Sequence, residues 1–513
     1  MKNTKKKEDL NDSLRIIFKT SLIIFLYLIL SKIFAYLYRI IIARHFGPEV
    51  YGLLSLALIV VGWFSAISFL GLSDGFLRFS SFYRGKNEID KIKYIFRLSI
   101  KILLFTGIIA SILLIILSSF ISLNIFHNSN LILFLNWFSL SILLYLFSYF
   151  FINVLTSFEK VGWSSFILNV LQNFIPLITL ILLVSLGVGK EAIIFSNIFG
   201  LACMALIGFL VCKFEIPEIF EKYQLKNNQK NEIKSKLLSY SLLFMLLSFV
   251  YSLFYGIDSF MIGYFKGVAE VGFYNSAVPI VALLLFPLGL FISLFFPLIT
   301  KEYAKKNFKL IEELSKQITK WIFIWNLPIL ILMILFPGAI LNVLFGPEYL
   351  TATNALRFLA IGTFFSAVLT IPLNLLFMIS KIKLVLLDIT LVVGIDILLN
   401  ILMVPKYGLD GAAFSTMISN ILLSLIFLIQ AKQNLKILPF RKKMINIALI
   451  TIIPTFLLFY SRKFVEINLI NIIILGALFI LIYLLLILIT GCLDRNDWMI
   501  INSVKGKFIQ QKL

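Results

Sequence analysis

The feature that most constrains this chain is a succession of apolar stretches, each long enough to cross a membrane. A helical crossing of roughly 30 Å of hydrocarbon takes about 20 residues. Backbone polar groups find no water there, so a crossing segment must satisfy them internally, as a helix does. We expect fourteen such spans, at residues 21–43, 51–73, 98–120, 131–155, 163–186, 192–212, 237–264, 271–299, 320–344, 352–379, 384–404, 409–430, 443–460 and 468–490.

Composition supports this expectation. Apolar residues make up 60% of the 513 residues and charged residues only 14%, whereas about 25% charged is usual in soluble domains. Such a chain cannot cover a soluble surface with polar groups, which excludes a soluble enzyme and most secreted or nucleic-acid-binding proteins. Three cysteines (Cys203, Cys212 and Cys492) are too few for a disulfide scaffold.

The lysines and arginines are distributed unequally between the two sides of the predicted spans. Of the 46 lysines and arginines, 37 fall in the segments that this topology puts inside the cell and six in the outer loops. This asymmetry is typical of membrane orientation and predicts a multi-pass protein of the cell membrane with both termini cytoplasmic. The net charge of +21 therefore indicates no nucleic-acid partner. No cleavage site follows the first apolar run, so we expect an uncleaved span.

An internal repeat relates the two halves. The segment Arg44–Ala57 resembles Tyr264–Ala277, and Leu186–Ser196 resembles Tyr407–Ser415 more weakly. Both pairs lie six spans apart, which predicts parallel repeats and an architecture found in transporters. The expected fold is an all-α integral membrane protein with about 14 transmembrane helices, in two pseudo-symmetric six-helix bundles plus two trailing helices.

This fold predicts the domain boundaries. They are a cytoplasmic basic tail (1–20), an N-terminal six-helix bundle (21–212), a cytoplasmic linker (213–236), a C-terminal six-helix bundle (237–430), two additional spans (443–490) and a cytoplasmic tail (491–513). Segment 301–320 alternates apolar and basic residues, which favours an amphipathic helix at the cytoplasmic interface.

Six short motifs occur in the order and topology of a known family: Arg44–Gly52, Gly71–Gly75, Gly256–Ser259, Glu270–Tyr274, Leu344–Tyr349 and Pro405–Ala413. In these motifs the chain resembles polysaccharide-biosynthesis exporters of the multidrug/oligosaccharidyl-lipid/polysaccharide superfamily. Within that superfamily it most resembles the O-antigen-type flippases. The resemblance implies movement of a polyprenyl-(pyro)phosphate-linked oligosaccharide from the inner to the outer leaflet, by alternating access.

Charged residues within spans need a reason, because each costs roughly 2.5–3.5 kcal/mol at the bilayer centre. Lys32 and Arg39 lie seven residues apart on one helix face, with Tyr36 near that face. We expect this stripe, with Arg44 in the first outer loop, to bind the phosphate of the substrate. The alternative for Arg39 is that its side chain reaches water at the outer end of the span.

The seventh span carries Asp258, which the repeat places within a residue or two of Arg39. Three roles stay open for it. These are a salt bridge between the bundles, a coupling-ion site for a proton or a sodium ion, and a structural partner for Lys266.

Three further charged residues are candidates for gating. Asp74 and Arg78 lie four residues apart at the inner end of the second span. They are interpreted either as a cytoplasmic gate or as a plain interfacial ion pair. Asp396 precedes Asn400 by one turn in the eleventh span, for coupling or an interhelical hydrogen bond.

The fifth span has polar residues on one face, which are either a cavity lining that a proline can kink or contacts between helices. They are Asn169, Gln172, Asn173 and Pro176.

The remaining patterns argue against catalysis. No loop is long enough for a catalytic domain, no P-loop motif or nucleophile–base pair is present, and the two histidines lack metal-ligand neighbours. We expect no enzyme, no cofactor and no metal. The partners are a lipid-linked oligosaccharide, membrane lipid and a coupling ion. The alternative function is an ion-coupled drug or metabolite exporter of the same fold, which the basic first span disfavours.

Overall fold

The computed structural model describes residues 2–461, 469–494 and 497. All regular elements of this part are helical. Eleven of its helical segments are long and apolar enough to cross a membrane, and Ile474–Ile489 is a shorter apolar helix. The expected multi-pass all-α class is therefore confirmed, while the number of fourteen spans stays a prediction. Residues 498–513 of the predicted cytoplasmic tail lie outside the described residues.

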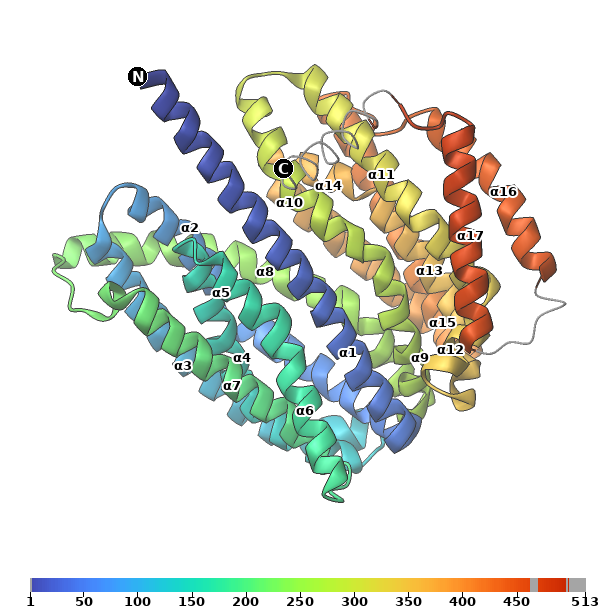
Figure 1. Ribbon diagram of the computed structural model, residues 1–513. Coiled ribbons are helices and arrows are strands. Elements are labelled where there is room, and N and C mark those ends of the chain that lie inside the picture. The colour runs from blue at the N-terminus through green and yellow to red at the C-terminus, as the bar shows by residue number, and fades with distance from the viewer. Residues whose placement is uncertain (1, 462–468, 495–496, 498–513) are drawn as a thin grey trace. The chain divides into compact units, whose positions relative to one another are not determined.

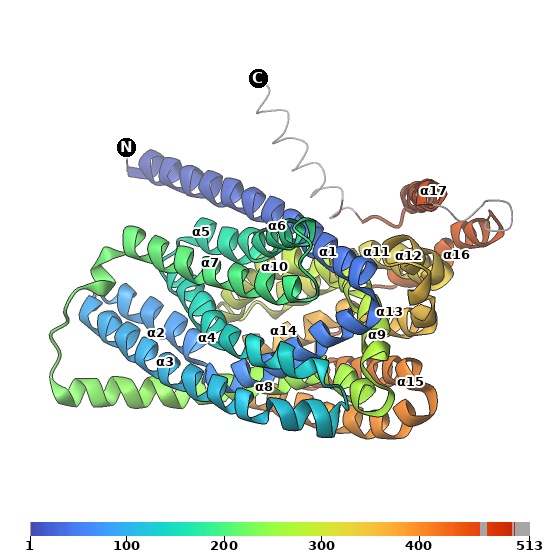
Figure 2. The same cartoon turned by 90° about the horizontal axis from the view of Figure 1, so that it is seen from below.

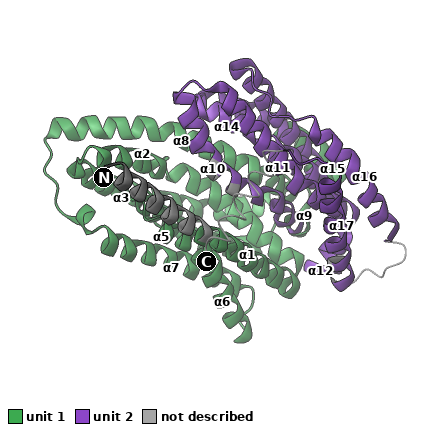
Figure 3. Ribbon diagram, turned by 45° about the horizontal axis from the view of Figure 1, so that its top comes forward, with its two compact units in different colours: residues 1–275, 397–412 green, residues 276–396, 413–513 purple. Residues whose placement is uncertain are grey.

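Two compact units divide the chain (Figure 3). Unit 1 comprises residues 1–275 and 397–412. Its elements are α1 (Lys2–Ser68), α2 (Leu72–Gly85), α3 (Ile89–Phe120), η1 (Ile121–Ile125), α4 (Asn130–Ser157), α5 (Val161–Ser165), η2 (Phe166–Leu171), α6 (Gln172–Ser185), α7 (Glu191–Glu215), η3 (Pro217–Phe220), α8 (Asn227–Lys266) and the first residues of α9 (Val268–Val281).

Unit 2 comprises residues 276–396 and 413–513. Its elements are η4 (Ala282–Leu285), α10 (Phe286–Ala304), α11 (Phe308–Leu335), α12 (Pro337–Leu344), η5 (Pro347–Ala352), α13 (Thr353–Val368), α14 (Thr370–Met378), α16 (Lys443–Ser461) and α17 (Leu469–Ile489). Helix α15 (Ile382–Leu435) supplies residues to both units.

Helix α4 is central to unit 1, where it packs against α3 and α7 (Figures 1 and 2). One face of α4 is fully buried, at Phe134, Phe138, Ile142, Leu146 and Phe150. These positions recur every four residues, which is the spacing of one helix face. Between membrane helices such a face stabilises by van der Waals contact, because lipid tails are as apolar as the side chains.

The predicted repeat has a structural counterpart at two glycines. Gly47 interrupts α1 with φ 80° and ψ 177°, and Gly267 follows α8 with φ 94° and ψ 175°. Only glycine adopts this backbone conformation at low cost. The break at Gly47 falls between the predicted spans 21–43 and 51–73, so α1 is two helices that meet at a turn. The second repeat pair also carries positive φ angles, at Gly187 and at Gly408 within α15.

The two repeats touch each other at matching positions. Gly52 lies five residues after Gly47, and a Cβ atom on it would overlap the carbonyl oxygen of Val268. Gly272 lies five residues after Gly267, and a Cβ atom there would overlap the carbonyl oxygen of Pro48. The contact is reciprocal, as expected of two copies related by a two-fold axis.

Two predicted boundaries differ from the structure. The expected interfacial helix 301–320 is not a separate element, because α10 ends at Ala304 and α11 runs from Phe308 to Leu335 without a break. Helix α8 begins at Asn227, inside the predicted linker 213–236. In both places polar and charged residues, lysine, glutamate and glutamine among them, extend a membrane helix beyond its apolar part.

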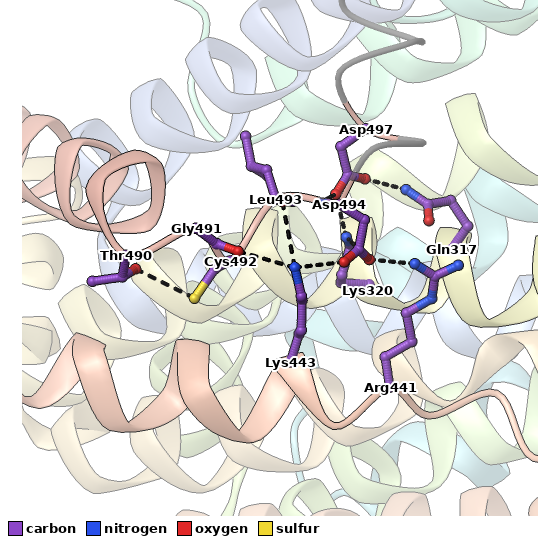
Figure 4. A network of polar contacts seen from close by, with 10 residues as sticks. All are labelled: Gln317, Lys320, Arg441, Lys443, Thr490, Gly491, Cys492, Leu493, Asp494 and Asp497. Carbon is purple, nitrogen blue, oxygen red and sulfur yellow. Dashed lines mark hydrogen bonds and ion pairs between the residues drawn. The ribbon is translucent and has the colours of Figure 1, made fainter.

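A buried ion network fastens the segment after α17 to the rest of unit 2 (Figure 4). The side chain of Lys320, on α11, is fully buried and forms ion pairs with Asp494, at 2.9 Å, and with Asp497. Gln317, one turn earlier, donates a hydrogen bond to Asp497. The two carboxylates thus share one buried cation.

The connector between α15 and α16 joins the same network. Arg441 in the connector and Lys443, the first residue of α16, both form ion pairs with Asp494, the latter at 2.6 Å. Burial alone would raise the pKa of Asp494, but hydrogen bonds from Lys443, Lys320 and Arg441 hold this pKa well below its ordinary value. Asp494 therefore stays ionised, and its contribution to stability is lost only when the pH falls below the ordinary range of a carboxyl group.

We predict that Lys320→Gln lowers the free energy of unfolding by about 3–5 kcal/mol, because it removes the cation that pairs with the fully buried carboxylate of Asp497. The measurement is thermal unfolding of the purified protein in detergent. The control is Lys236→Gln, which breaks an exposed pair between Lys236 and Glu232 and should leave the stability nearly unchanged, because solvent screens an exposed ion pair. Equal shifts in Tm for the two variants would contradict the prediction.

Candidate functional site

Unit 1 contains a cavity of about 380 Å³ between its helices. Four tyrosines, three asparagines, one glutamine, one serine and one arginine contribute the polar part of its lining, and aliphatic residues the remainder. The polar residues are Tyr38, Arg39, Tyr51, Ser55, Tyr145, Gln172, Asn173, Asn197, Tyr255 and Asn275. They come from α1, α4, α6, α7, α8 and α9.

Hydrogen bonds between helices hold several of these side chains in place. The Tyr38 hydroxyl on α1 lies 3.1 Å from Ser196 Oγ on α7 and accepts a hydrogen bond from Asn197. Asn173 on α6 donates to Ser31 Oγ on α1 at 3.0 Å. These bonds link α1 to α6 and α7, which fixes the wall on which Arg39 is carried.

A local irregularity precedes the amides of α6. Residues Phe166–Leu171 form a π-helical turn, η2, and Gln172 begins the regular helix that follows. Pro176 is buried against Gly200, where a Cβ atom would collide with the proline ring. Single π-turns inside membrane helices often occur at functional sites. The sequence expectation of a kinked polar lining agrees with the positions of Gln172, Asn173 and Pro176, while Asn169 bonds to the Ser165 carbonyl instead.

The electrostatics of the cavity are simple. Among the described residues that line it, Arg39 carries the one formal charge, and no aspartate or glutamate is present. The amides and hydroxyls supply both donors and acceptors. In a low-dielectric surrounding an uncompensated guanidinium favours an anion, and phosphate oxygens match its planar donors. The cavity is thus suited to an anionic group that carries hydroxyls.

The other residues of the predicted cationic stripe lie elsewhere. Lys32 and Tyr36 are half-buried on α1, outside the cavity lining. Lys32 lies seven residues before Arg39, so it shares a helix face with Arg39. The same spacing places Lys32 about 10 Å from Arg39 along the helix axis. Arg44 is exposed near the turn at Gly47. The structure therefore brings one member of the predicted substrate site, Arg39, to the cavity and does not bring the other three there.

Asp258 is 5% exposed and lies in a hydrogen-bonded cluster of unit 1. One carboxylate oxygen accepts a hydrogen bond from the Tyr274 hydroxyl at 2.6 Å, and the other from Asn400 Nδ2 at 3.0 Å. The next residue, Ser259, accepts a hydrogen bond from Asn275 Nδ2 at 2.9 Å. Ser259 lies eight residues before Gly267, as Arg39 lies eight residues before Gly47. In the repeat register Asp258 is therefore the neighbour of the residue that corresponds to Arg39.

The Asp258 cluster adjoins the cavity. The carbonyl oxygen of Asn275, a lining residue, accepts a hydrogen bond from the Tyr51 hydroxyl at 3.1 Å. Tyr51 in turn lies within hydrogen-bonding reach of Arg39. Hydrogen bonds, with the peptide link between Tyr274 and Asn275, thus connect the buried carboxylate of Asp258 to the wall that carries Arg39.

The three predicted gating residues have separate surroundings. Asp74 is exposed on α2, and Arg78 lies over the ring of Tyr240 at 4.2 Å. None of the ion pairs among the described residues joins Asp74 to Arg78. In unit 2, Asp396 is buried and accepts a hydrogen bond from Ser419 at 2.8 Å, across the break in α15.

The sequence interpretation missed most of the lining. Tyr38, Tyr51, Tyr145, Asn197 and Asn275 carry no charge, and single polar uncharged residues are common in membrane helices as contacts between helices. The one signal for Asn275 was its place in the repeated segment.

Two family descriptions match the sequence. "Polysaccharide biosynthesis protein" matches residues 17–302, more than half of the chain, and "MatE" matches residues 244–405. The chain belongs to the polysaccharide biosynthesis protein family. This membership confirms the resemblance drawn from the sequence motifs.

Two relatives are similar to most of this family member. An uncharacterized membrane protein of Methanocaldococcus jannaschii is 24% identical over 482 residues, which are 88% of this chain and 91% of that protein. A putative O-antigen transporter of Shigella flexneri is 25% identical over 408 residues, which are 75% of this chain and 90% of that protein.

Solved structures share the fold. The lipid II flippase MurJ in an inward closed conformation has a TM-score of 0.72 at 19% identity, covering 91% of this chain and 98% of MurJ. An inward-facing multidrug resistance MATE family transporter of the MOP superfamily has a TM-score of 0.68 at 15% identity, covering 79% of this chain and 94% of that transporter. This family member therefore shares the fold of these two solved structures.

We predict that Tyr274→Phe lowers the free energy of unfolding by about 1.5–3 kcal/mol, because Asp258 loses a hydroxyl donor to a buried carboxylate. Thermal unfolding in detergent measures the change. Tyr264→Phe is the control, since Tyr264 is 48% exposed on the same helix as Asp258. A Tyr274→Phe variant as stable as the control would show that the hydroxyl contributes nothing.

Proposed function

We propose that this protein is a flippase that moves polyprenyl-(pyro)phosphate-linked oligosaccharide across the cell membrane for assembly of a surface polysaccharide or glycan. The observation that carries the proposal is the cavity of unit 1, with Arg39 as its one charge among uncharged amides and hydroxyls. The guanidinium suits the phosphate, and the amides and hydroxyls suit sugar hydroxyls. Family membership and the name of the Shigella flexneri relative support the same class of cargo.

The proposed mechanism is alternating access, with the two repeats moving about the sugar and phosphate while the polyprenyl chain stays in lipid. The reciprocal contact of Gly52 with Val268 and of Gly272 with Pro48 is the proposed closure on the outer side. Backbones that touch without side chains between them leave no passage, and small movements of either repeat separate them. Lys32, Tyr36 and Arg44 remain proposed contacts of the substrate in other states of this cycle.

Asp258 is the proposed coupling site for a proton or a sodium ion, with Asp396, Asp74 and Arg78 as proposed gating residues. Its carboxylate fixes Tyr274, whose neighbour Asn275 lines the cavity and accepts from Tyr51. A proton or cation at Asp258 competes with these donors for the carboxylate oxygens. Binding of the ion would thereby loosen the Tyr274–Asn275 segment beside the proposed closure.

The second candidate is an ion-coupled drug or metabolite exporter, which the MatE match to residues 244–405 favours. Organic cations would need carboxylates in the cavity, and its described lining has none. A deletion strain that becomes drug-sensitive and keeps its surface glycan would favour this candidate over the flippase.

We predict that Arg39→Glu reduces flipping by at least about a hundredfold, because a unit charge pair at 4 Å contributes about 4 kcal/mol at an effective dielectric constant of 20. The measurement is the leaflet distribution of lipid-linked oligosaccharide in a deletion strain that expresses each variant. The substrate should accumulate in the inner leaflet with Arg39→Glu.

The matched control is Lys406→Glu, an exposed charge reversal in unit 1 outside the cavity lining. It should leave the distribution as in the wild type. Normal export by Arg39→Glu, with the protein inserted at normal levels, would overturn the cationic cavity. Adding Lys32→Glu tests whether the second cation of the stripe contributes.

We predict that Asp258→Asn removes the dependence of flipping on an ion gradient, since an amide cannot exchange a proton or offer a charged ligand to sodium. Proteoliposomes with an imposed proton or sodium gradient measure this dependence. Asp90→Asn, at a half-exposed position on α3, is the control and should keep the dependence on the gradient. A gradient response that survives in Asp258→Asn would place coupling at another residue.

A further inference from the structure

A second cavity lies in unit 2, where α11 begins and α15 ends. Its volume is about 430 Å³. The first turns of α11, the last turn of α15 and the connector to α16 line it, with Glu312, Lys316, Lys432, Lys436, Leu438 and Phe440. Three lysines and one glutamate give this lining a net charge of +2. Nothing in the proposed transport cycle uses it.

The charge on the α15 side is uncompensated by protein. Lys316 forms an ion pair with Glu312 at 2.5 Å on the same helix. In the part of the chain that the structure describes, no ion pair within 4.0 Å involves Lys432 or Lys436. One of these two cations offsets the partial negative charge at the end of α15. The other remains available to a bound anion.

The neighbouring acids are already engaged. Asp494 and Asp497 are held by Lys320, Arg441 and Lys443 (Figure 4). This network fixes the connector that follows Phe440, and it gives its own carboxylates three cations. Asp494 and Asp497 therefore need no ion pair with Lys432 or Lys436. The connector that the network fixes lies beside these two lysines.

The same cavity has an apolar edge. Leu438 and Phe440 are 36% and 42% exposed, on either side of the buried Pro439. Cations beside exposed apolar side chains match an amphiphile better than a free ion, which would leave the apolar edge unfilled. Both α11 and α15 have the length and composition of membrane spans, so we expect their ends at headgroup level. Basic pockets between such helices are suited to anionic lipid headgroups.

We infer that this cavity binds the phosphate headgroup of an anionic phospholipid, with Lys432 and Lys436 as the cations and Leu438 and Phe440 along the acyl chain. The site is separate from the substrate cavity of unit 1. Its occupant is a lipid of the leaflet that the loop charges predict to be cytoplasmic.

The test is binding of fluorescent phosphatidylglycerol to the purified full-length protein in phosphatidylcholine nanodiscs. The wild type should bind the probe in preference to a phosphatidylcholine probe with the same chains. The double variant Lys432→Gln/Lys436→Gln should bind phosphatidylglycerol about thirtyfold more weakly, because each lysine near a membrane surface contributes a factor of about five to six.

The control is Lys306→Gln/Lys309→Gln, which removes the same charge at two exposed lysines of unit 2 that do not line the cavity. It should bind as the wild type does. Equal loss in both double variants would show only general attraction and would overturn the site. Displacement of the probe by millimolar inorganic phosphate, or by polyprenyl phosphate at a hundredfold lower concentration than phosphatidylglycerol, would overturn phospholipid as the occupant.

Discussion

Polar side chains inside hydrocarbon must find partners within the protein, and the arrangement of unit 1 follows from this requirement. Tyr38, Asn197 and Asn173 bond across α1, α6 and α7, so these helices are held together by the groups that water would otherwise solvate. The surplus donors and acceptors of the same residues face the cavity. The interactions that fix the helices thus also create a polar interior within an apolar protein.

Glycine has the complementary role of removing side chains where backbones meet. Gly47 and Gly267 allow two turns that other residues would make costly. Five residues later, Gly52 and Gly272 let each repeat touch the backbone of the other. A contact of this kind is close but has few side chains to rearrange, so it can form and break with little loss of packing. That property suits a closure that must open in every transport cycle.

The sequence allowed the class, the repeat and part of the cavity lining to be predicted, for different physical reasons. The predicted lining residues are Arg39, Gln172, Asn173 and Pro176. Long apolar runs admit only one structure in lipid, which made the helices predictable. Gly47 and Gly267 marked the repeat because their backbone conformation excludes other residues. Arg39 was identifiable because a charge in a span is costly. Tyr51 and Asn275 could not be identified as cavity residues in this way. Their role depends on which helices pack against each other, and no local sequence pattern encodes the choice of neighbouring helices.

Lys32 shows where the same reasoning reached its limit. The helical period placed it correctly on the face of Arg39, but a face is a line some tens of ångströms long and a cavity occupies only part of it. Depth along the helix is set by where polar residues of other helices converge, here Gln172 and Asn173 after the π-turn η2. A single cation at that depth, among amides and hydroxyls, attracts a phosphate without holding it as tightly as several cations would. The proposed carrier, which would have to release its anionic cargo on the far side, benefits from this weaker binding, because affinity shared by both ends of the cycle slows release.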